Sequence, residues 1–153
     1  MFDRQPWMQR AGDYPRTDES YFGLLSRAIF SAGLGPKVVE ARWPGLVAGF
    51  RGFDPVAVAQ MGEDDVTALL ADASVIRNRR KIEAVVANAP VFIDIVEEHG
   101  SFRKYLDFIG SAEDFEGAAE ALAERFTHLG PASAGYFLYR CGWRRQEGAK
   151  TAA

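Results

Sequence analysis

The sequence predicts an all-α protein, a bundle of helices with no sheet. Apolar residues recur at intervals of three and four along most of the chain, which is the spacing of one face of an α-helix. No segment shows the sustained alternation of apolar and polar residues, bounded by hairpin turns, that is typical of a β-strand. Apolar residues make up 48% and aromatic residues 12% of the 153 residues, so the chain can bury one sizeable core.

Residues that start and stop helices divide this pattern into segments. A cap at residue 17 or 18 begins a first helix, which Gly33 closes. Pro36 starts a second helix, and Pro44 is expected to interrupt it because proline lacks the N–H that a helix interior needs. Further helices are expected over 55–62, 63–71, 76–100, 102–110, 115–127 and 134–141. Pro90 lies inside the longest segment, so a kink or a break into two helices is expected there.

The chain is expected to contain one domain with two irregular ends. Residues 1–16 form a polar and aromatic N-terminal arm, residues 17–143 a single helical domain, and residues 144–153 a flexible tail. No uncharged apolar run approaches the ~18 residues that a membrane span requires, and the arm has no apolar segment of the secretory kind. We therefore expect a monomeric cytoplasmic protein that does not insert into membranes.

The possible metal ligands are few and far apart. His99, His128 and Cys141 are the only histidine and cysteine residues, whereas a structural Cys/His zinc site usually needs four donors. A single cysteine also excludes an internal disulfide, which fits a reducing compartment. The chain lacks a glycine-rich phosphate loop and a nucleophile elbow. We expect neither a metal nor a cofactor.

Positive charge is concentrated in one short segment, although the net charge is −3. That total argues against a general nucleic-acid coat, because such binding depends on neutralising phosphates with Lys and Arg. The run Arg77, Asn78, Arg79, Arg80 and Lys81 is nevertheless dense enough to follow a DNA backbone. A solvated helix face with no partner would have the same sequence, so both interpretations remain open.

A second candidate for DNA binding is the turn near the end of the chain. A helix is expected to end at Leu129, glycine at position 130 permits a tight reversal, and a helix rich in small residues follows. This order is that of a helix-hairpin-helix, in which exposed N–H groups grip a phosphate without reading sequence. Gly130, Ala132 and Ser133 would supply the contacts. The alternative is an ordinary connection between two helices with glycine as the C-cap.

Aromatic and acidic residues near the front of the chain are candidates for a base pocket. Trp7 and Tyr21 could stack on an unpaired base, although aromatic residues more often fill cores. Glu40 and Trp43 lie on adjoining turns of the second helix. A carboxylate beside an aromatic ring suits a general base or a wall that recognises a cation, and the alternative for Glu40 is a plain surface charge.

The central run FDPVAVAQMGEDDVTALLADASVIRNRRKIEAVVANA, preceded by AIFSAGL and KVVEARWPG, closely resembles the DNA-3-methyladenine glycosylase I family. LGPASAGYFLYRCG resembles the last helix of the same family, so the resemblance covers residues 18–142. It implies a helical bundle of the helix-hairpin-helix DNA glycosylase type. It also implies an enzyme of base-excision repair, nucleoid-associated when bound, that flips an alkylated base out of duplex DNA and hydrolyses its N-glycosidic bond.

The chain departs from the family pattern where the base would bind. In the register of the family stretch E-G-x-x-A-G-L-S-W, Ala28 replaces the glutamate that recognises the methylated base and Pro36 replaces the tryptophan that walls the pocket. The zinc clasp of the family is absent as well. A carboxylate facing a cationic base gives a charge-assisted hydrogen bond, which alanine cannot provide. Either another group such as Glu40 takes over, or selectivity changes, or the chemistry is lost.

Three functions therefore remain: a DNA glycosylase, a catalytically inactive helix-hairpin-helix DNA-binding protein, and a helical interaction domain. The candidate catalytic residue is Glu40. The candidate base-pocket residues are Trp7, Tyr21, Ala28, Ser31, Pro36 and Trp43. The candidate DNA-binding residues are Arg77, Asn78, Arg79, Arg80, Lys81, Gly130, Ala132 and Ser133.

Overall fold

The computed structural model describes residues 15–143, which form eight α-helices, one short 3₁₀ turn and no strand. The elements are α1 Asp18–Ser31, α2 Pro36–Gly49, η1 Arg51–Phe53, α3 Pro55–Ala59, α4 Glu63–Ala71, α5 Arg79–His99, α6 Phe102–Ala112, α7 Phe115–Arg125 and α8 Pro131–Arg140. The all-α prediction is confirmed. The expected tail and all but the last two residues of the expected arm lie outside the described range.

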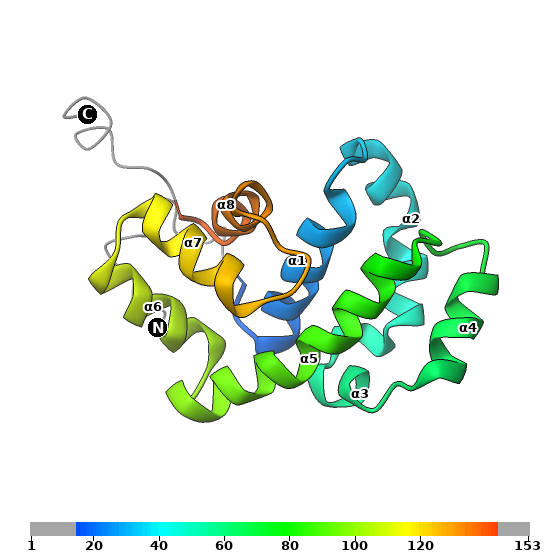
Figure 1. Ribbon diagram of the computed structural model, residues 1–153, viewed down its shortest axis with the longest axis horizontal. Coiled ribbons are helices and arrows are strands. Elements are labelled where there is room, and N and C mark those ends of the chain that lie inside the picture. The colour runs from blue at the N-terminus through cyan, green and yellow to red at the C-terminus, as the bar shows by residue number, and fades with distance from the viewer. Residues whose placement is uncertain (1–14, 144–153) are drawn as a thin grey trace.

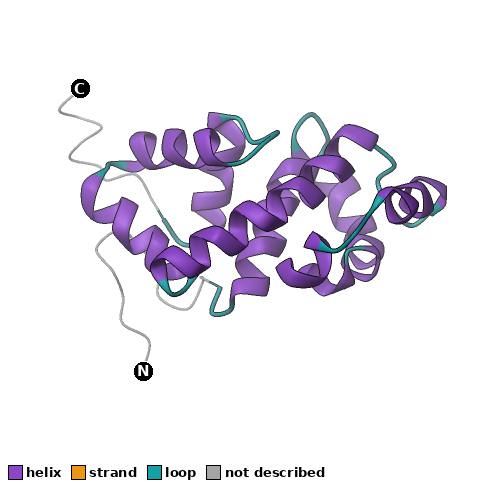
Figure 2. Cartoon of the chain, turned by 60° about the horizontal axis from the view of Figure 1, so that its bottom comes forward, coloured by secondary structure: helices purple, strands orange, loops and turns teal. Residues whose placement is uncertain are grey.

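The helices form two groups joined by α1 and α5 (Figure 1). Helices α6, α7 and α8 pack on one side, where α7 contacts α8 and α8 contacts α1. Helices α2, α3 and α4 lie on the other side, with α3 packed closely on α5 (Figure 2). Because α1 and α5 touch each other and both groups, the central pair fixes how the two sides are placed.

Side-chain caps account for where most of the helices begin. In each case the side-chain oxygen accepts a hydrogen bond from an amide of the first turn, which typically stabilises a helix by about 1 kcal/mol. The capping residues are Thr17, Asp54, Asn78, Ser101 and Asp114. The expected boundaries shift slightly, since α5 begins at Arg79 and α7 ends at Arg125.

The interruption expected at Pro44 is wrong, and so is the break into two helices that was one of the two alternatives at Pro90. Pro44 lies inside a continuous α2, and Pro90 lies inside a continuous α5. Both prolines are exposed, whereas the apolar face of α5 continues across Pro90 from Ala89 to Phe92 without interruption. Tertiary packing of this face therefore compensates for the one backbone hydrogen bond that Pro90 removes.

Aromatic rings tie the central helices to the segment between α7 and α8. Phe92 of α5 stacks on Phe102 of α6 with centroids 4.4 Å apart and planes 9° apart. The ring of Phe102 also contacts Phe126, at 6.2 Å, and Phe137 of α8, at 6.0 Å. All four rings are buried, so the position of the α7–α8 connection is set by the core itself.

Candidate nucleic-acid interface

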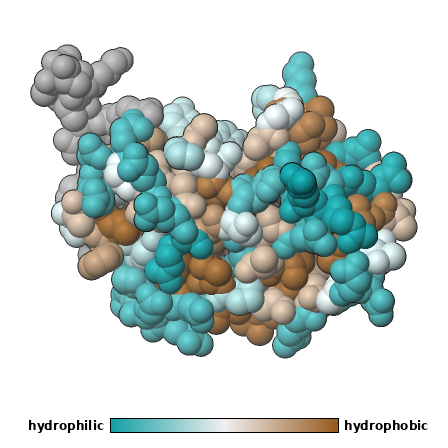
Figure 3. All heavy atoms as spheres, in the orientation of Figure 1, coloured by the Kyte–Doolittle hydropathy of each residue, from teal (hydrophilic) through white to brown (hydrophobic). Residues whose placement is uncertain are grey.

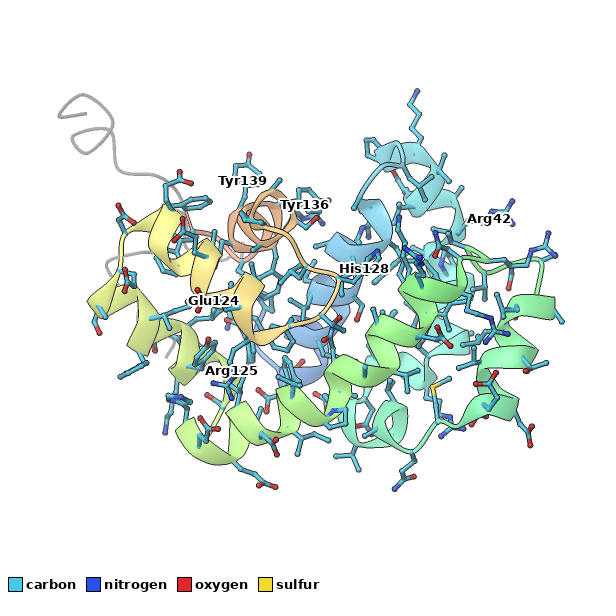
Figure 4. The ribbon with its side chains drawn as sticks, in the orientation of Figure 1. Arg42, Glu124, Arg125, His128, Tyr136 and Tyr139 are labelled. Atoms are coloured by element: carbon cyan, nitrogen blue, oxygen red, sulfur yellow. The ribbon has the colours of Figure 1, made fainter. Side chains whose placement is uncertain are left out.

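The connection between α7 and α8, residues 126–130, turns its large apolar side chains inward and leaves its other residues exposed. Phe126 and Leu129 are buried, whereas Thr127, His128 and Gly130 are exposed. His128 adopts a left-handed backbone conformation with φ 60°, which reverses the chain between the two anchors. In Figure 4 His128 lies between α8 and α5, on the side where α1 ends and α2 begins.

The first turn of α8 has backbone donors with no acceptor. The first intrahelical hydrogen bond of α8 is donated by the amide of Ala134 to the carbonyl of Gly130, at 2.9 Å. The amides of Ala132 and Ser133 precede it, and neither has an acceptor within residues 15–143. Ala132 is exposed and Ser133 is half-buried. These N–H groups and the positive end of the helix dipole suit a phosphate oxygen.

A buried asparagine fixes this connection to α5. The Asn88 side chain donates through Nδ2 to the carbonyl of Thr127, at 3.1 Å, and accepts through Oδ1 from the Thr127 amide, at 2.9 Å. Asn88 is 1% exposed, so water cannot replace either bond. The hairpin is therefore held in place by two complementary hydrogen bonds as well as by its apolar anchors.

The basic run 77–81 is less uniform than the sequence suggests. The structure corrects the expectation for its last member, Lys81, which is not on the surface. Lys81 is 7% exposed, and its ammonium donates to the carbonyls of Phe30, at 3.1 Å, and Ala32, at 2.5 Å. These carbonyls end α1, where backbone acceptors have no partner of their own. Burial lowers the pKa of Lys81 from its ordinary value. Lys81 is thus part of the interior rather than of a surface for phosphates.

The other members of the run have three different roles. Asn78 caps α5 by accepting from the Lys81 amide at 3.1 Å. Arg79 is exposed but pairs with Glu63 at 3.1 Å and with Glu83 at 3.4 Å, which reduces its availability. Arg77 and Arg80 are exposed and form no ion pair with the part of the chain that the structure describes.

Two candidate pocket residues, Tyr21 and Ala28, lie inside the protein on the same face of α1. Both are 1% exposed. The Tyr21 ring packs on Phe102 at 5.7 Å, and its hydroxyl has no hydrogen-bond partner within the described residues. Burial raises the pKa of this hydroxyl far above its ordinary value, with a smaller contribution from Cys141, so the group is neutral. Trp7 lies outside the described residues.

Trp43, on α2, packs against a different side of α1 from the side that carries Tyr21 and Ala28. Its ring stacks on Phe53 with centroids 5.1 Å apart and planes 12° apart, and the guanidinium of Arg27 lies 4.9 Å from its centre. The ring borders a hollow of about 320 Å³ that is also lined by Gly23, Leu24 and Phe53. The structure therefore does not bring Trp43 together with Tyr21 and Ala28.

The remaining pocket candidates are also dispersed. The Ser31 hydroxyl donates to the carbonyl of Arg27 at 2.7 Å, a bond within α1. Pro36 is exposed in the first turn of α2. Glu40 is exposed on α2, and its side chain makes no hydrogen bond or ion pair with other residues of the range 15–143, so the structure gives it none of the surroundings of a general base.

Sequence reasoning missed the turn between α1 and α2 as a surface feature. Leu34 is 37% exposed and Val38 is 47% exposed, and Gly33 beside them has φ 77°. In the space-filling view, apolar side chains lie on the projecting end of α1 and α2, across a dip in the surface from α8 (Figure 3). The signal that could have found this feature is an apolar residue between two glycines.

No carboxylate is buried anywhere in the described range, where the buried polar residues are Ser26, Lys81 and Asn88. Among the same residues, no three His, Cys, Asp or Glu side chains gather closely enough to hold a metal ion. None of the helices is both long and apolar enough to cross a bilayer. The structure thus offers exposed backbone donors and two unpaired arginines, but no buried acid.

Comparison with known proteins gives a consistent result. The model of the methyladenine glycosylase family matches residues 7–129. DNA-3-methyladenine glycosylase 1 of Escherichia coli K12 is 37% identical over 98 residues, which is 63% of this chain and 51% of that protein. The match therefore spans about half the length of this curated relative.

Solved structures of similar proteins extend the comparison to the fold. A crystal structure of 3-methyladenine DNA glycosylase I matches with a TM-score of 0.72 and 26% identity, over 92% of this chain and 93% of that one. The enzyme from Staphylococcus aureus, solved to explain 3-methyladenine recognition, matches with a TM-score of 0.76 over 89% of this chain and 80% of its own. Its identity of 24% supports the fold alone.

Proposed function

The chain belongs to the methyladenine glycosylase family, and from this premise we propose that it is a DNA glycosylase of base-excision repair. It binds duplex DNA that carries a damaged base, flips an alkylated base such as 3-methyladenine out of the stack and hydrolyses its N-glycosidic bond. We propose that it acts as a monomer in the cytoplasm, associated with the nucleoid when bound. One observation carries the proposal: the amides of Ala132 and Ser133 stand without acceptors on an exposed helix N-terminus.

The hairpin and the start of α5 together supply a grip on the DNA backbone. Amides at a helix N-terminus bind phosphate without reading the base sequence, as a repair enzyme requires when it searches along DNA. Arg77 and Arg80 add positive charge that no carboxylate of the described residues neutralises. Asn88 joins the hairpin to α5, so the two contacts belong to one rigid surface.

The apolar turn between α1 and α2 supplies a wedge. Extruding a base leaves a gap in the stack, and DNA-bending proteins commonly fill such steps with an apolar side chain. Leu34 is exposed at the tip of this turn, and Val38 extends the apolar surface behind it. The 37% of Leu34 that stays exposed in the free protein is available to contact a base step.

The absence of a buried acid restricts the substrates. A 3-methylated adenine is cationic, so when water attacks the sugar carbon and the C1′–N bond breaks, the bonding electrons neutralise the base. The base then leaves without being protonated, and the proton of the attacking water passes to solvent. Since no carboxylate is buried in residues 15–143, hydrolysis depends on this leaving group. We propose that the substrates are cationic alkylpurines rather than neutral damaged bases.

The test is single-turnover excision from methylated duplex DNA, with the released bases separated by chromatography. Release of 3-methyladenine and no release of uracil or hypoxanthine from matched duplexes is expected. The Glu40→Gln variant should excise at the wild-type rate, because Glu40 is exposed and unbonded. Release of neutral bases at a comparable rate would overturn the restriction to cationic substrates.

A second candidate function is that of a lesion-binding protein that does not hydrolyse. It is favoured by Ala28, which is 1% exposed and stands where the resembling family has its glutamate. Tight binding to methylated duplex with no base released would select this function. A lack of any salt-dependent duplex binding at ~50 mM salt, where phosphate contacts are strong, would leave only a helical interaction domain.

A further inference from the structure

Helix α5 has two buried polar side chains on one face, at Lys81 and Asn88, seven residues apart. Seven residues are two turns, so the side chains point the same way about 10 Å apart along the helix axis. The ammonium of Lys81 donates to the carbonyls of Phe30 and Ala32. The amide of Asn88 bonds both backbone groups of Thr127.

Each of these bonds ends at the base of an exposed turn. Ala32 begins the turn that carries Leu34, and Thr127 begins the hairpin that leads to the exposed amides of α8. The two turns lie far apart in sequence and belong to the two different groups of helices, although both face the same side of the molecule (Figure 1). Helix α5 is the element to which both are hydrogen-bonded by buried side chains, so it sets the distance between them.

Stability alone is a poor explanation for a lysine in this position. Burying an ammonium carries a desolvation penalty that its hydrogen bonds need not fully offset, and an apolar side chain of similar length avoids that penalty. The last turn of α1 contains no basic residue, so Lys81 also supplies from α5 the positive charge that favours a helix C-terminus. What lysine adds over an apolar side chain is a directed connection to two chosen carbonyls.

We propose that Lys81 and Asn88 are positioning residues that hold the α1–α2 turn and the α7–α8 hairpin at the spacing needed to engage one DNA duplex together. The claim that this spacing serves DNA binding rests on the proposed function. The claim that the two side chains set the spacing does not. Neither side chain touches DNA. Both act through the backbone that they hold.

The spacing is tested without DNA by amide hydrogen exchange in Lys81→Met and Asn88→Leu. In Lys81→Met the Leu34 amide, which bonds Ser31 O at 3.0 Å, should exchange about 10-fold faster, while the Ala134 amide keeps its rate. In Asn88→Leu the Ala134 amide should accelerate and Leu34 should not. The control Val85→Ala removes buried apolar volume between Lys81 and Asn88. It should not selectively accelerate exchange of either the Leu34 amide or the Ala134 amide. Unchanged local exchange in both variants would overturn the proposal.

Binding to a duplex with a tetrahydrofuran abasic site then tests the purpose. Each variant should bind about 10-fold more weakly than Val85→Ala, and the double variant little more weakly than either single one, because both lose the same spacing. The slope of log affinity against log salt should stay at the wild-type value. A fall in the slope of about 1 in Lys81→Met would mean a direct phosphate contact and would overturn the proposal.

The outcomes of the two experiments are separable. If the wild-type protein does not bind the duplex, the proposed function fails, and the exchange rates still decide whether the two residues set the spacing. If Lys81→Met does not fold, Lys81→Gln replaces it, since glutamine is shorter and uncharged but keeps a donor. Selective acceleration of Leu34 in Lys81→Gln supports the proposal, and an unchanged rate opposes it.

Discussion

The α7–α8 hairpin and the buried face of α1 are built on opposite principles. The hairpin exposes backbone: Ala132 and Ser133 present amides to solvent, and apolar anchors hold them from behind. The face of α1 hides its side chains: Tyr21 and Ala28 are each 1% exposed, and the tyrosine hydroxyl has no partner in the described part of the chain. The hairpin can bind an anion without rearranging, whereas the buried face of α1 presents neither a charge nor an unoccupied surface.

This difference teaches that gripping DNA and recognising a base depend on separate properties of the chain. A phosphate site made of backbone amides needs only a tight reversal and a helix that starts after it. Recognition of a damaged base needs particular side chains around a cavity. A protein can therefore have the first property in full while the second differs from that of the family it resembles.

The largest effect is expected from placing the family's carboxylate back into α1. Ala28→Glu should lower the free energy of unfolding by about 3 kcal/mol or more, because Ala28 is 1% exposed and both the volume and the charge of the new side chain would have to be buried. Urea unfolding at pH 7 measures the loss. Excision of 3-methyladenine should not increase.

The isosteric variant Ala28→Gln is the control for size without charge. It should destabilise less than glutamate, since a neutral amide costs less to bury than a carboxylate. A stable Ala28→Glu with faster excision would show that a cavity opens beside α1, and the comparison between the two regions would then fail.

The next largest effect is expected at the hairpin. Ala132→Glu places a carboxylate at the second position of α8, where the helix dipole favours it by about 0.3–1 kcal/mol. Stability should therefore hold or rise, whereas the affinity for duplex DNA should fall about 10-fold or more because the carboxylate occupies the phosphate site. Fluorescence anisotropy with a labelled duplex measures the affinity.

A matched control comes from another helix start. Val56 is exposed and occupies the second position of α3, so Val56→Glu adds the same charge at the same kind of site, away from the hairpin. It should weaken DNA binding no more than about 2-fold, the expectation for a general change in net charge. Equal losses in the two variants would mean that the hairpin has no special role.

How much of this could be predicted from sequence depends on whether a feature is local. The cap before α1 and the starts of α3 and α6 at residues 55 and 102 follow from residue types at neighbouring positions, and the structure agrees with them. The reversal expected at Gly130 instead occurs at His128, which has the left-handed conformation, while Gly130 is extended. The interruption expected at Pro44 and the break into two helices considered at Pro90 are wrong, because tertiary packing can outweigh one missing hydrogen bond.

The site was harder to predict, because its members meet through tertiary contacts. A lysine in a run of arginines gives no sign that its ammonium will be buried against α1, as Lys81 is. Asn88 lies in an apolar helix face, and its partner Thr127 is 39 residues away. The sequence suggests one pocket that contains Trp43, Tyr21 and Ala28, but Trp43 packs on a different side of α1 from the other two.

A smaller effect should distinguish the arginines of the basic run. Arg77→Ala and Arg80→Ala should each reduce the salt slope of duplex binding by about 1, as expected for one lost phosphate contact. Arg79→Ala should reduce it less, because that guanidinium is paired with Glu63 and Glu83. Titrations between ~50 and ~200 mM salt measure the slopes. Equal slopes in all three variants would remove the run from the interface.

The smallest effect concerns the buried hydroxyl on the face of α1. Tyr21→Phe should raise the free energy of unfolding by up to about 1 kcal/mol at pH 7, because it removes a polar group that is buried without a partner. The gain should grow above pH 10, since burial raises the pKa of Tyr21: the unfolded wild-type chain then loses a proton that the folded protein keeps, and wild-type stability falls. Urea midpoints at pH 7 and at pH ~10.5, above the ordinary tyrosine pKa, measure both effects. If Tyr21→Phe instead leaves stability unchanged and slows excision, the hydroxyl contacts the flipped base, and the face of α1 is a pocket wall after all.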